Sequence, residues 1–362
     1  MFVSKIKIAG LLLATSVLFS CGKDYTTKEI IIQNMKRVAD YELAHPSVHY
    51  SKNDTYNYPS GWVPSTFYLS LLPLYEATND VKYKEVVEAW TKKVNYKCAP
   101  RVVNPDDMIC GQTFLDYYKY EKKEEIVADL VVRLDTLMAI YHEKNSNWRS
   151  SNTLFMGPPV FMAAGDILNE PKYIDYADNL FWGSHHALFD PKENLFYRDT
   201  KSRKKYAARK QKSFWSRGNG YVLAALARII PHIEDRRRKD KYIGLFEKMA
   251  VRIGDLQQSN GLWTSDLINS DKTPNKETSG SALNVYALTW GINNGILSSE
   301  KFTPIVKKGW NALNDCVNEQ TGMLGFVQPI GAAPGNTQED ITMSYGAMGF
   351  ILAGTEMLEL VN

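Results

Sequence analysis

Cysteine is scarce in this chain, and its few cysteines form no recognisable metal motif. Four are present, and setting Cys21 aside leaves Cys98, Cys110 and Cys316, with no Cys-x-x-Cys pair and no histidine partner at zinc spacing. A structural metal is therefore not expected. No other cofactor is expected. In an oxidising compartment Cys98 and Cys110 can pair, but buried free thiols are an equally good interpretation, because cysteine behaves as a small hydrophobic residue.

Strong charge of one sign is also lacking. The formal net charge is +3 over 362 residues. The basic clusters at 201–212 and 236–241 are interpreted as solvated loops. Nucleic acid is therefore not expected as a partner.

Long apolar runs are missing beyond the first residues. Lys5 and Lys7 precede an apolar stretch at 8–19, which is too short to span a bilayer as a mature helix and ends at Cys21. The sequence Leu-x-Ser-Cys resembles the bacterial lipobox. We expect residues 1–21 to act as a lipoprotein signal peptide, with lipidated Cys21 anchoring a periplasmic or cell-envelope domain. The alternative is an ordinary cleaved signal with an incidental cysteine.

The rest of the chain alternates between apolar and amphipathic segments of helical length. The mostly apolar segments are 64–76, 109–120, 153–168, 220–230, 280–292 and 344–358. The amphipathic segments are 28–43, 82–94, 123–141, 172–188, 241–257 and 301–316. A helix that is apolar nearly all round belongs inside, and one with a charged face belongs outside. This pattern predicts an all-α (α/α)6 barrel of six helical hairpins in one domain, 22–362. A solenoid is the alternative, but the spacing is uneven and no polar capping repeat is visible.

Polar and aromatic residues gather just before the apolar segments. They lie at Trp62, 104–107, 148–152, 215–217, 277–279 and 338–340. If the inner helices run parallel, these residues meet at one mouth of the barrel. A concave, aromatic-lined site with convergent polar groups is a candidate ligand site. For each carboxylate taken alone, helix N-capping is the rival explanation.

The segment Phe214 to Tyr221 gives the sharpest indication of a ligand. Trp215 and Arg217 stand beside two glycines at a helix start, where backbone N–H groups are unsatisfied. An indole stacks on a sugar ring, a guanidinium holds a carboxylate with two hydrogen bonds, and glycines let a ligand approach the backbone. Together these features indicate an acidic sugar. The alternative is a core aromatic, a surface charge and a simple turn.

Seven motifs carry a resemblance to a known family. They are DDMICGQTFLD at 106–116, NTLFMGPP at 152–159, LFYRD at 195–199, FWSRGNG at 214–220, LQQ at 256–258, ETSGS at 277–281 and FVQPIG at 326–331. In this order they resemble the unsaturated glucuronyl and rhamnogalacturonyl hydrolases, glycoside hydrolase families 88 and 105. Family 105 fits better, especially at 214–220 and at the Asp-Asp segment.

The resemblance implies an activity and a partner. Such enzymes act on oligosaccharides whose non-reducing end carries the unsaturated uronic acid that polysaccharide lyases leave. Water adds across the C4=C5 enol-ether bond, and the resulting hemiketal collapses and expels the remaining sugar. The reaction needs a proton donor for C4 and a base for the water that attacks C5, and one Asp can perform both steps in turn. The resemblance implies no metal and no glycosyl-enzyme intermediate, unlike the usual two-carboxylate glycosidase.

The chain departs from the family pattern at one position. The family's catalytic Asp is replaced by Asn152, whose amide hydrogen-bonds to water but does not exchange a proton at neutral pH. Four explanations remain open: an introduced substitution, another acid that has taken over, different chemistry, or a non-catalytic sugar-binding role.

The resemblance also assigns roles to the surrounding residues. Asp107 matches the family's second Asp and is the best remaining acid, beside Asp106, which is expected to contact substrate or cap the following helix. Two adjacent carboxylates can raise one another's pKa. The residues expected to bind substrate are Arg217 as carboxylate clamp, Trp215 as stacking platform, Tyr221 where the family often has Trp, and Arg198 and Trp148 as further lining residues.

Overall fold

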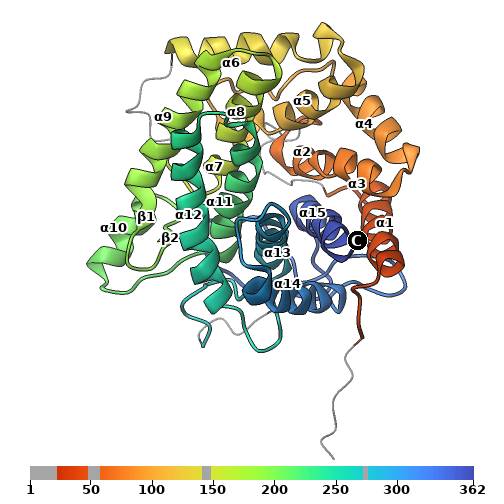
Figure 1. Ribbon diagram of the computed structural model, residues 1–362, viewed down its shortest axis with the longest axis vertical. Helices are drawn as coiled ribbons and strands as arrows, with labels where there is room; N and C mark the ends of the chain where they lie inside the picture. The colour runs from red at the N-terminus through yellow and green to blue at the C-terminus, as the bar shows by residue number, and fades with distance from the viewer. Residues whose placement is uncertain (1–22, 48–57, 141–147, 272–275) are drawn as a thin grey trace, which may run out of the picture.

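Two concentric rings of helices make up the computed structural model, which describes residues 23–47, 58–140, 148–271 and 276–362 (Figure 1). The outer ring contains α1 (Lys28–Ala44), α4 (Val81–Lys93), α6 (Ala128–Ile140), α9 (Pro171–Leu188), α12 (Arg236–Asp255) and α14 (Ser299–Asn314). The inner ring contains α2 (Trp62–Leu69), α3 (Leu71–Thr78), α5 (Cys110–Glu121), α7 (Thr153–Met156), α8 (Pro158–Ile167), α11 (Ser216–Ile229), α13 (Thr278–Asn293) and α15 (Ser344–Val361). The predicted signal peptide and Cys21 lie outside the described residues.

The inner helices close a ring. In chain order, α2 contacts α5, α5 contacts α8, α8 contacts α11, α11 contacts α13, α13 contacts α15, and α15 returns to α2. This closure confirms the predicted all-α (α/α)6 barrel and excludes the solenoid.

The burial pattern explains which helices lie inside. Every residue of α13 from Thr278 to Ile292 is buried. In α12 the buried side chains recur at helical spacing on one face, and arginines and lysines occupy the other. An apolar stripe of this kind packs against the inner ring while the charged face stays in water.

Several features were not predicted from the sequence. The inner segment 64–76 is interrupted at Ser70, and the segment 153–168 is interrupted at Gly157, which is followed by two prolines. A two-stranded hairpin and several 3-10 helices were also missed, because they are too short to show a period. They are β1 (Phe189–Asp190), β2 (Leu195–Phe196), η2 (Pro105–Met108), η3 (Glu124–Ile126) and η5 (Ile230–His232). The interpretation of the two basic clusters as loops is wrong: 201–212 lies largely in α10 (Thr200–Ala208), which buries none of its residues and so shows no apolar face, and 236–241 begins α12.

Two further expectations concern the state of the cysteines and the absence of a membrane-spanning helix. Cys98, Cys110 and Cys316 are free and buried, which matches the free-thiol interpretation and not the disulfide. No helix among the described residues is both long and apolar enough to cross a bilayer.

Candidate active site

A cavity of about 310 Å³ opens where the inner helices begin. Its lining residues are Trp62, Arg101, Asp106, Asn152, Arg198, Trp215, Arg217, Tyr221, Ile330 and Gly331. Six of the residues expected from the sequence therefore meet in one place, from segments far apart along the chain. Two others, Asp107 and Trp148, are not among the lining residues.

A layered stack of aromatic rings and one guanidinium forms part of the wall. Trp62 stacks on Tyr345 with ring centroids 5.6 Å apart. The Arg217 guanidinium lies 4.4 Å from the ring centroid of Tyr345 and 4.5 Å from that of Trp215. The Trp215 indole N–H donates to Gln328 Oε1 at 2.9 Å, which fixes its orientation. Of the two indoles, Trp62 is the more exposed, so it offers the better face to a sugar.

Arg217 is 2% exposed and already binds protein atoms. Its guanidinium donates to Ser279 Oγ at 3.4 Å, to the Pro329 carbonyl at 3.2 Å and to the Gln328 carbonyl. Tyr345 is a further hydrogen-bond partner of this guanidinium. The side chain is therefore held in place at the cavity wall by protein atoms.

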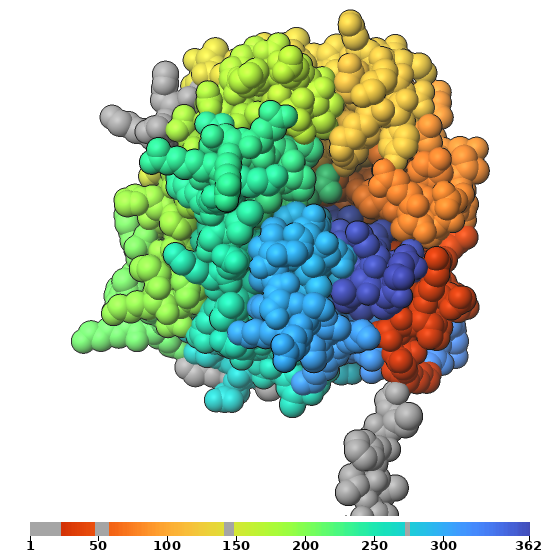
Figure 2. All heavy atoms as spheres, in the orientation of Figure 1, coloured from red at the N-terminus to blue at the C-terminus, as the bar shows by residue number. Residues whose placement is uncertain are grey.

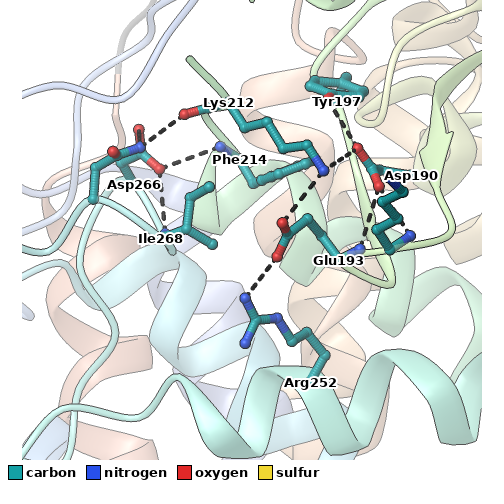
Figure 3. A network of polar contacts seen from close by, with 10 residues as sticks. Asp190, Glu193, Tyr197, Lys212, Phe214, Arg252, Asp266 and Ile268 are labelled. Atoms are coloured by element: carbon teal, nitrogen blue, oxygen red, sulfur yellow. Dashed lines mark hydrogen bonds and ion pairs between the residues drawn. The ribbon is translucent and has the colours of Figure 1, made fainter. Parts of the chain in front are cut away.

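The segment that enters α11 is fixed by a polar network, drawn in Figure 3. The Asp266 carboxylate accepts hydrogen bonds from Ser213 Oγ at 2.6 Å and from the Phe214 N–H at 3.2 Å. Lys212 forms ion pairs with Asp190 at 2.9 Å and Glu193 at 3.3 Å. Because the segment is held on both sides, Trp215 and Arg217 are positioned without any ligand.

The glycines of the 214–220 motif serve packing and not ligand approach. A Cβ added to Gly218 would lie 2.6 Å from Ser151 Oγ, and one added to Gly220 would lie 3.2 Å from the Gly280 carbonyl oxygen. Both positions need glycine because neighbouring segments come that close. The expectation that these glycines let a ligand approach the backbone is therefore wrong, because protein atoms occupy that space.

Asp107 faces a protein cation. Its carboxylate accepts hydrogen bonds from Arg101 at the backbone N–H (2.9 Å), Nε (3.1 Å) and Nη2 (2.5 Å), and the residue is 1% exposed. This paired, buried carboxylate holds Arg101 at the cavity wall. Asn104 caps η2 by accepting from the Asp106 N–H at 2.9 Å, and α5 has no side-chain cap, so Asp106 does not cap the following helix.

Asp106 is the carboxyl group of the cavity wall. Burial raises its pKa, the Arg101 and Arg198 charges lower it and the Asp107 charge raises it, and together these effects place the pKa at about 6. A carboxyl group with a pKa near the working pH can both donate and accept a proton.

Two polar groups in the cavity wall have no protein partner. Asn152 Oδ1 and the Tyr221 hydroxyl are buried and form no hydrogen bond within the described part of the chain. The Tyr221 ring packs on Phe155 with centroids 5.1 Å apart, and burial raises its pKa, so the hydroxyl keeps its proton. Buried polar atoms of this kind are usually satisfied by water or a ligand.

Arg198 follows β2, and its backbone links the hairpin to the Asn152 segment. Its carbonyl accepts from the Ser151 N–H at 2.8 Å, and its guanidinium pairs with Asp199. Trp148, in contrast, packs its ring over Gly157, where an added Cβ would lie 2.1 Å from the indole. Its N–H donates to the Val103 carbonyl at 3.2 Å. Arg101 was missed in the sequence, where only its position ahead of the Asp pair hinted at a role.

Comparison with known proteins identifies the fold and the family. The sequence profile described as Glycosyl Hydrolase Family 88 matches residues 32–361. The chain belongs to this family. An unsaturated 3S-rhamnoglycuronyl hydrolase of Formosa agariphila is 31% identical over 347 residues, which cover 90% of each chain. This chain is therefore a glycoside hydrolase of the unsaturated uronyl hydrolase type. The closer fit to family 105 stays a prediction.

Two solved structures resemble the barrel throughout. A family 88 glycosyl hydrolase from Bacteroides vulgatus has a TM-score of 0.83 at 26% identity, covering 92% of this chain and 99% of that one. A protein described as a polysaccharide lyase has a TM-score of 0.83 at 27% identity, covering 92% and 98%. Among the described residues, no group of three or more His, Cys, Asp or Glu side chains is placed to hold a metal ion.

Replacing Arg217 with Lys tests the predicted carboxylate clamp. Lys keeps the charge but loses the planar fork. We expect affinity for a uronide-ended oligosaccharide to fall by about tenfold or more, as loss of a charged hydrogen bond usually costs, while affinity for the neutral counterpart stays unchanged. Calorimetric titration measures both, with Arg203→Lys, outside the cavity, as the control. Equal affinity of the unmodified protein for the two ligands would exclude the clamp.

Proposed function

We propose that this protein hydrates the C4=C5 double bond of an unsaturated uronic acid at the non-reducing end of an oligosaccharide, with Asp106 as its acid and base. Protonated Asp106 gives its proton to C4. The resulting carboxylate takes a proton from the water that attacks C5. The C5 hemiketal then opens, the bond to the leaving sugar breaks, and Asp106 ends the cycle protonated. The observation that carries this proposal is a carboxyl group with a pKa of about 6 in an arginine-lined cavity.

The other lining residues fit supporting roles. Arg217 lines the cavity and is placed to hold the uronate carboxylate, and Trp62 offers the more exposed apolar face to the sugar ring. The Asn152 Oδ1 atom and the Tyr221 hydroxyl are suited to bind the attacking water or a sugar hydroxyl, since neither atom has a partner among the described residues. Removing these partners would leave buried polar groups unsatisfied.

The charges of the cavity match a substrate with a uronate carboxylate. Two of the three arginines in the wall are paired with protein carboxylates, Arg101 with Asp107 and Arg198 with Asp199. Arg217 has no ion pair among the described residues, so one uronate carboxylate balances it. The Formosa agariphila relative is named for a rhamnoglycuronyl substrate. We infer a substrate of the rhamnoglycuronyl class.

A second candidate is β-elimination by a lyase. Two observations favour it: the amide at Asn152, and the 27% identity to a protein described as a polysaccharide lyase. Arginines that neutralise a uronate carboxylate would also acidify its C5 proton. Ultraviolet absorbance of the double bond separates the candidates with one assay. A hydrolase consumes the absorbance of lyase-generated oligosaccharides, whereas a lyase creates absorbance from saturated ones. No change with either substrate would favour a non-catalytic uronide-binding protein.

The pH profile gives a prediction for the proposed acid. Because the reaction begins with proton donation, the free enzyme must hold Asp106 protonated. The raised pKa keeps it protonated below about pH 6. We therefore expect kcat/KM to be insensitive to this group below pH 6 and to fall about tenfold per pH unit above it. Initial rates between pH 4 and 8 measure the profile. A rate that rises through pH 6 would mean that Asp106 acts as a base from the start.

The proposed location is the cell envelope, with a lipid anchor at Cys21. The lipobox-like sequence supports this proposal. Replacing Cys21 with Ser should release the protein into the soluble periplasmic fraction without changing its melting temperature, since the thioether anchor is lost and the barrel begins later in the chain. Detergent partitioning of the two forms tests this, and a Cys21→Ser protein that stays in the membrane phase would contradict it.

A further inference from the structure

A buried carboxylate lies behind the cavity wall, at the start of α13. Glu277 is 0% exposed and is not among the residues that line the cavity. It occupies the N-cap position of α13, where its carboxylate accepts from the Ser279 N–H at 2.8 Å and the Gly280 N–H at 2.7 Å. An acidic side chain stabilises a helix start in this way. Capping therefore explains these two hydrogen bonds.

Two further hydrogen bonds to Glu277 are not explained by capping. Its Oε1 atom also accepts from the Ser279 hydroxyl and, at 3.4 Å, from the Gln328 backbone N–H. Both donors belong to residues that bind Arg217. The Arg217 guanidinium donates to Ser279 Oγ at 3.4 Å and to the Gln328 carbonyl. One carboxylate therefore holds two of the residues that hold the guanidinium.

The Ser279 hydroxyl connects the carboxylate to the guanidinium. A hydroxyl has one proton to donate and two lone pairs with which to accept. Because the Ser279 proton goes to Glu277, the same oxygen presents a lone pair to Arg217.

The connection is short because the starts of α11 and α13 adjoin. A Cβ added to Gly280 would lie 2.7 Å from the Arg217 backbone nitrogen and 2.8 Å from Glu277 Oε2. The two helices lie side by side in the inner ring (Figure 1), and Figure 2 shows the outer helices α1, α12 and α14 on the surface around that ring. Both charged groups are therefore enclosed by protein.

Arg217 and Glu277 balance each other's charge. Arg217 is 2% exposed and has no ion pair among the described residues. Both charges act on the ring of Tyr345: burial raises its pKa, the Arg217 charge lowers it and the Glu277 charge raises it, and together these effects place the pKa at about 12. A buried charge without a compensating charge nearby destabilises a folded protein. Glu277 is therefore suited to stabilise the buried guanidinium.

We propose that Glu277 and Ser279 are positioning residues for Arg217: the Glu277 carboxylate supplies its counter-charge, and the Ser279 hydroxyl fixes the direction of its guanidinium at the cavity wall. Neither side chain touches the substrate. A guanidinium that is already fixed loses less conformational freedom when it binds a carboxylate. The effect on substrate binding rests on the proposed function, in which Arg217 holds the uronate carboxylate.

Ser279→Ala removes the connecting hydroxyl and leaves the backbone N–H groups that Glu277 caps. We expect affinity for a uronide-ended oligosaccharide to fall by about five- to tenfold, since one hydrogen bond to a charged group is lost. Affinity for the neutral counterpart should stay unchanged. Calorimetric titration of the full chain measures both.

Ser281→Ala is the matched control for loss of a buried hydroxyl. Ser281 is also 0% exposed, and its hydroxyl donates to the Glu277 backbone carbonyl at 2.6 Å and accepts from the Trp263 N–H at 2.9 Å. It does not bind Arg217. We expect Ser281→Ala to lower the melting temperature about as much as Ser279→Ala does, and to keep both affinities of the unmodified protein.

Proton exchange of the Arg217 guanidinium gives a measurement that needs no substrate. Nuclear magnetic resonance of the free protein, carrying isotope-labelled arginine, measures this exchange with water, and the signal lost in Arg217→Lys assigns it. We expect exchange to be about tenfold faster in Ser279→Ala, because the guanidinium opens more easily without this acceptor. Exchange in Ser281→Ala should match that of the unmodified protein.

Glu277→Gln tests the counter-charge. Gln keeps an oxygen for the Ser279 hydroxyl but carries no charge. We expect a lower melting temperature and a larger rise in melting temperature on adding the uronide-ended oligosaccharide, because the ligand carboxylate then replaces the missing charge. Loss of a helix cap alone would lower the melting temperature equally with and without ligand. Ser279→Ala keeps the cap, so the positioning role remains testable should Glu277→Gln fail to fold.

The opposing outcomes are distinct. Unchanged guanidinium exchange in Ser279→Ala, or an equal loss of uronide affinity in Ser281→Ala, would overturn the positioning role of Ser279. An unaltered ligand-induced rise in melting temperature in Glu277→Gln would reduce Glu277 to a helix cap. If the unmodified protein binds uronide-ended and neutral oligosaccharides equally while guanidinium exchange depends on Ser279, the proposed function fails and the positioning role stands.

Discussion

Replacing Asp106 with Asn is expected to lower kcat on an unsaturated uronide by about a hundred- to ten-thousand-fold, the usual contribution of a positioned acid–base group. The amide keeps the shape of the side chain, so KM and melting temperature should change little. Single-turnover loss of the double-bond absorbance measures the rate. Asp240→Asn, on the exposed face of α12 at 65% side-chain exposure, is the control.

The same experiment on Asp107 separates the two adjacent carboxylates. Asp107 is the acid favoured from sequence, but its carboxylate is occupied by Arg101 at 2.5 Å. Asp107→Asn would leave a buried cation without its partner, so we expect a lower melting temperature as well as a loss of rate. If Asp107→Asn removes turnover at an unchanged melting temperature and Asp106→Asn keeps the rate, the acid is Asp107 after all.

The fold could be predicted because the distribution of apolar residues along each segment shows whether its helix is buried on all sides or on one face. The inner segment 280–292 is apolar or small throughout, and the structure buries all of it in α13. The outer segment 241–257 has one apolar face, and α12 packs that face inward. The breaks inside inner helices were not predicted from the sequence. Ser70 interrupts the first one, and its mark is Pro73 three residues later, which lacks the N–H that would bond to the Leu69 carbonyl.

Site residues were predicted correctly where they lie together in one short sequence motif. Trp215, Arg217 and Tyr221 lie within two turns of α11, so their common mouth follows from helix geometry. The direction of single side chains did not follow. Which of two adjacent aspartates faces the cavity depends on the η2 turn and on Arg101, several residues earlier.

The direction of the Trp148 side chain was also not predictable. Because Trp148 lies close to Asn152 in the sequence, it was expected to line the site, but its ring packs over Gly157. The deciding contact lies in the following helix pair, and a missing Cβ at that glycine is what makes room for the indole. Sequence proximity to a site residue therefore says little about where a large aromatic side chain points.

Restoring a carboxyl group at Asn152 is expected to give the largest gain. Asn152→Asp replaces an amide by a group of nearly identical shape that carries a proton, at the position where the resemblance places the family's acid. The change keeps the buried Oδ1 atom, which has no partner among the described residues, and replaces Nδ2 by a second oxygen. We expect turnover of an unsaturated uronide to rise by about two orders of magnitude or more.

Kinetics of Asn152→Asp, Asp106→Asn, the double variant and the unmodified protein, compared as a cycle, give the coupling between the two positions. If Asp106 has taken over the role of the missing acid, the double variant should recover turnover that Asp106→Asn alone has lost. An Asn152→Asp variant no faster than the unmodified protein, with Asp106→Asn inactive in both backgrounds, would make Asn152 a binding residue and Asp106 the sole acid. Four forms without measurable turnover on any uronide would instead favour the binding-protein alternative, because binding needs no proton transfer.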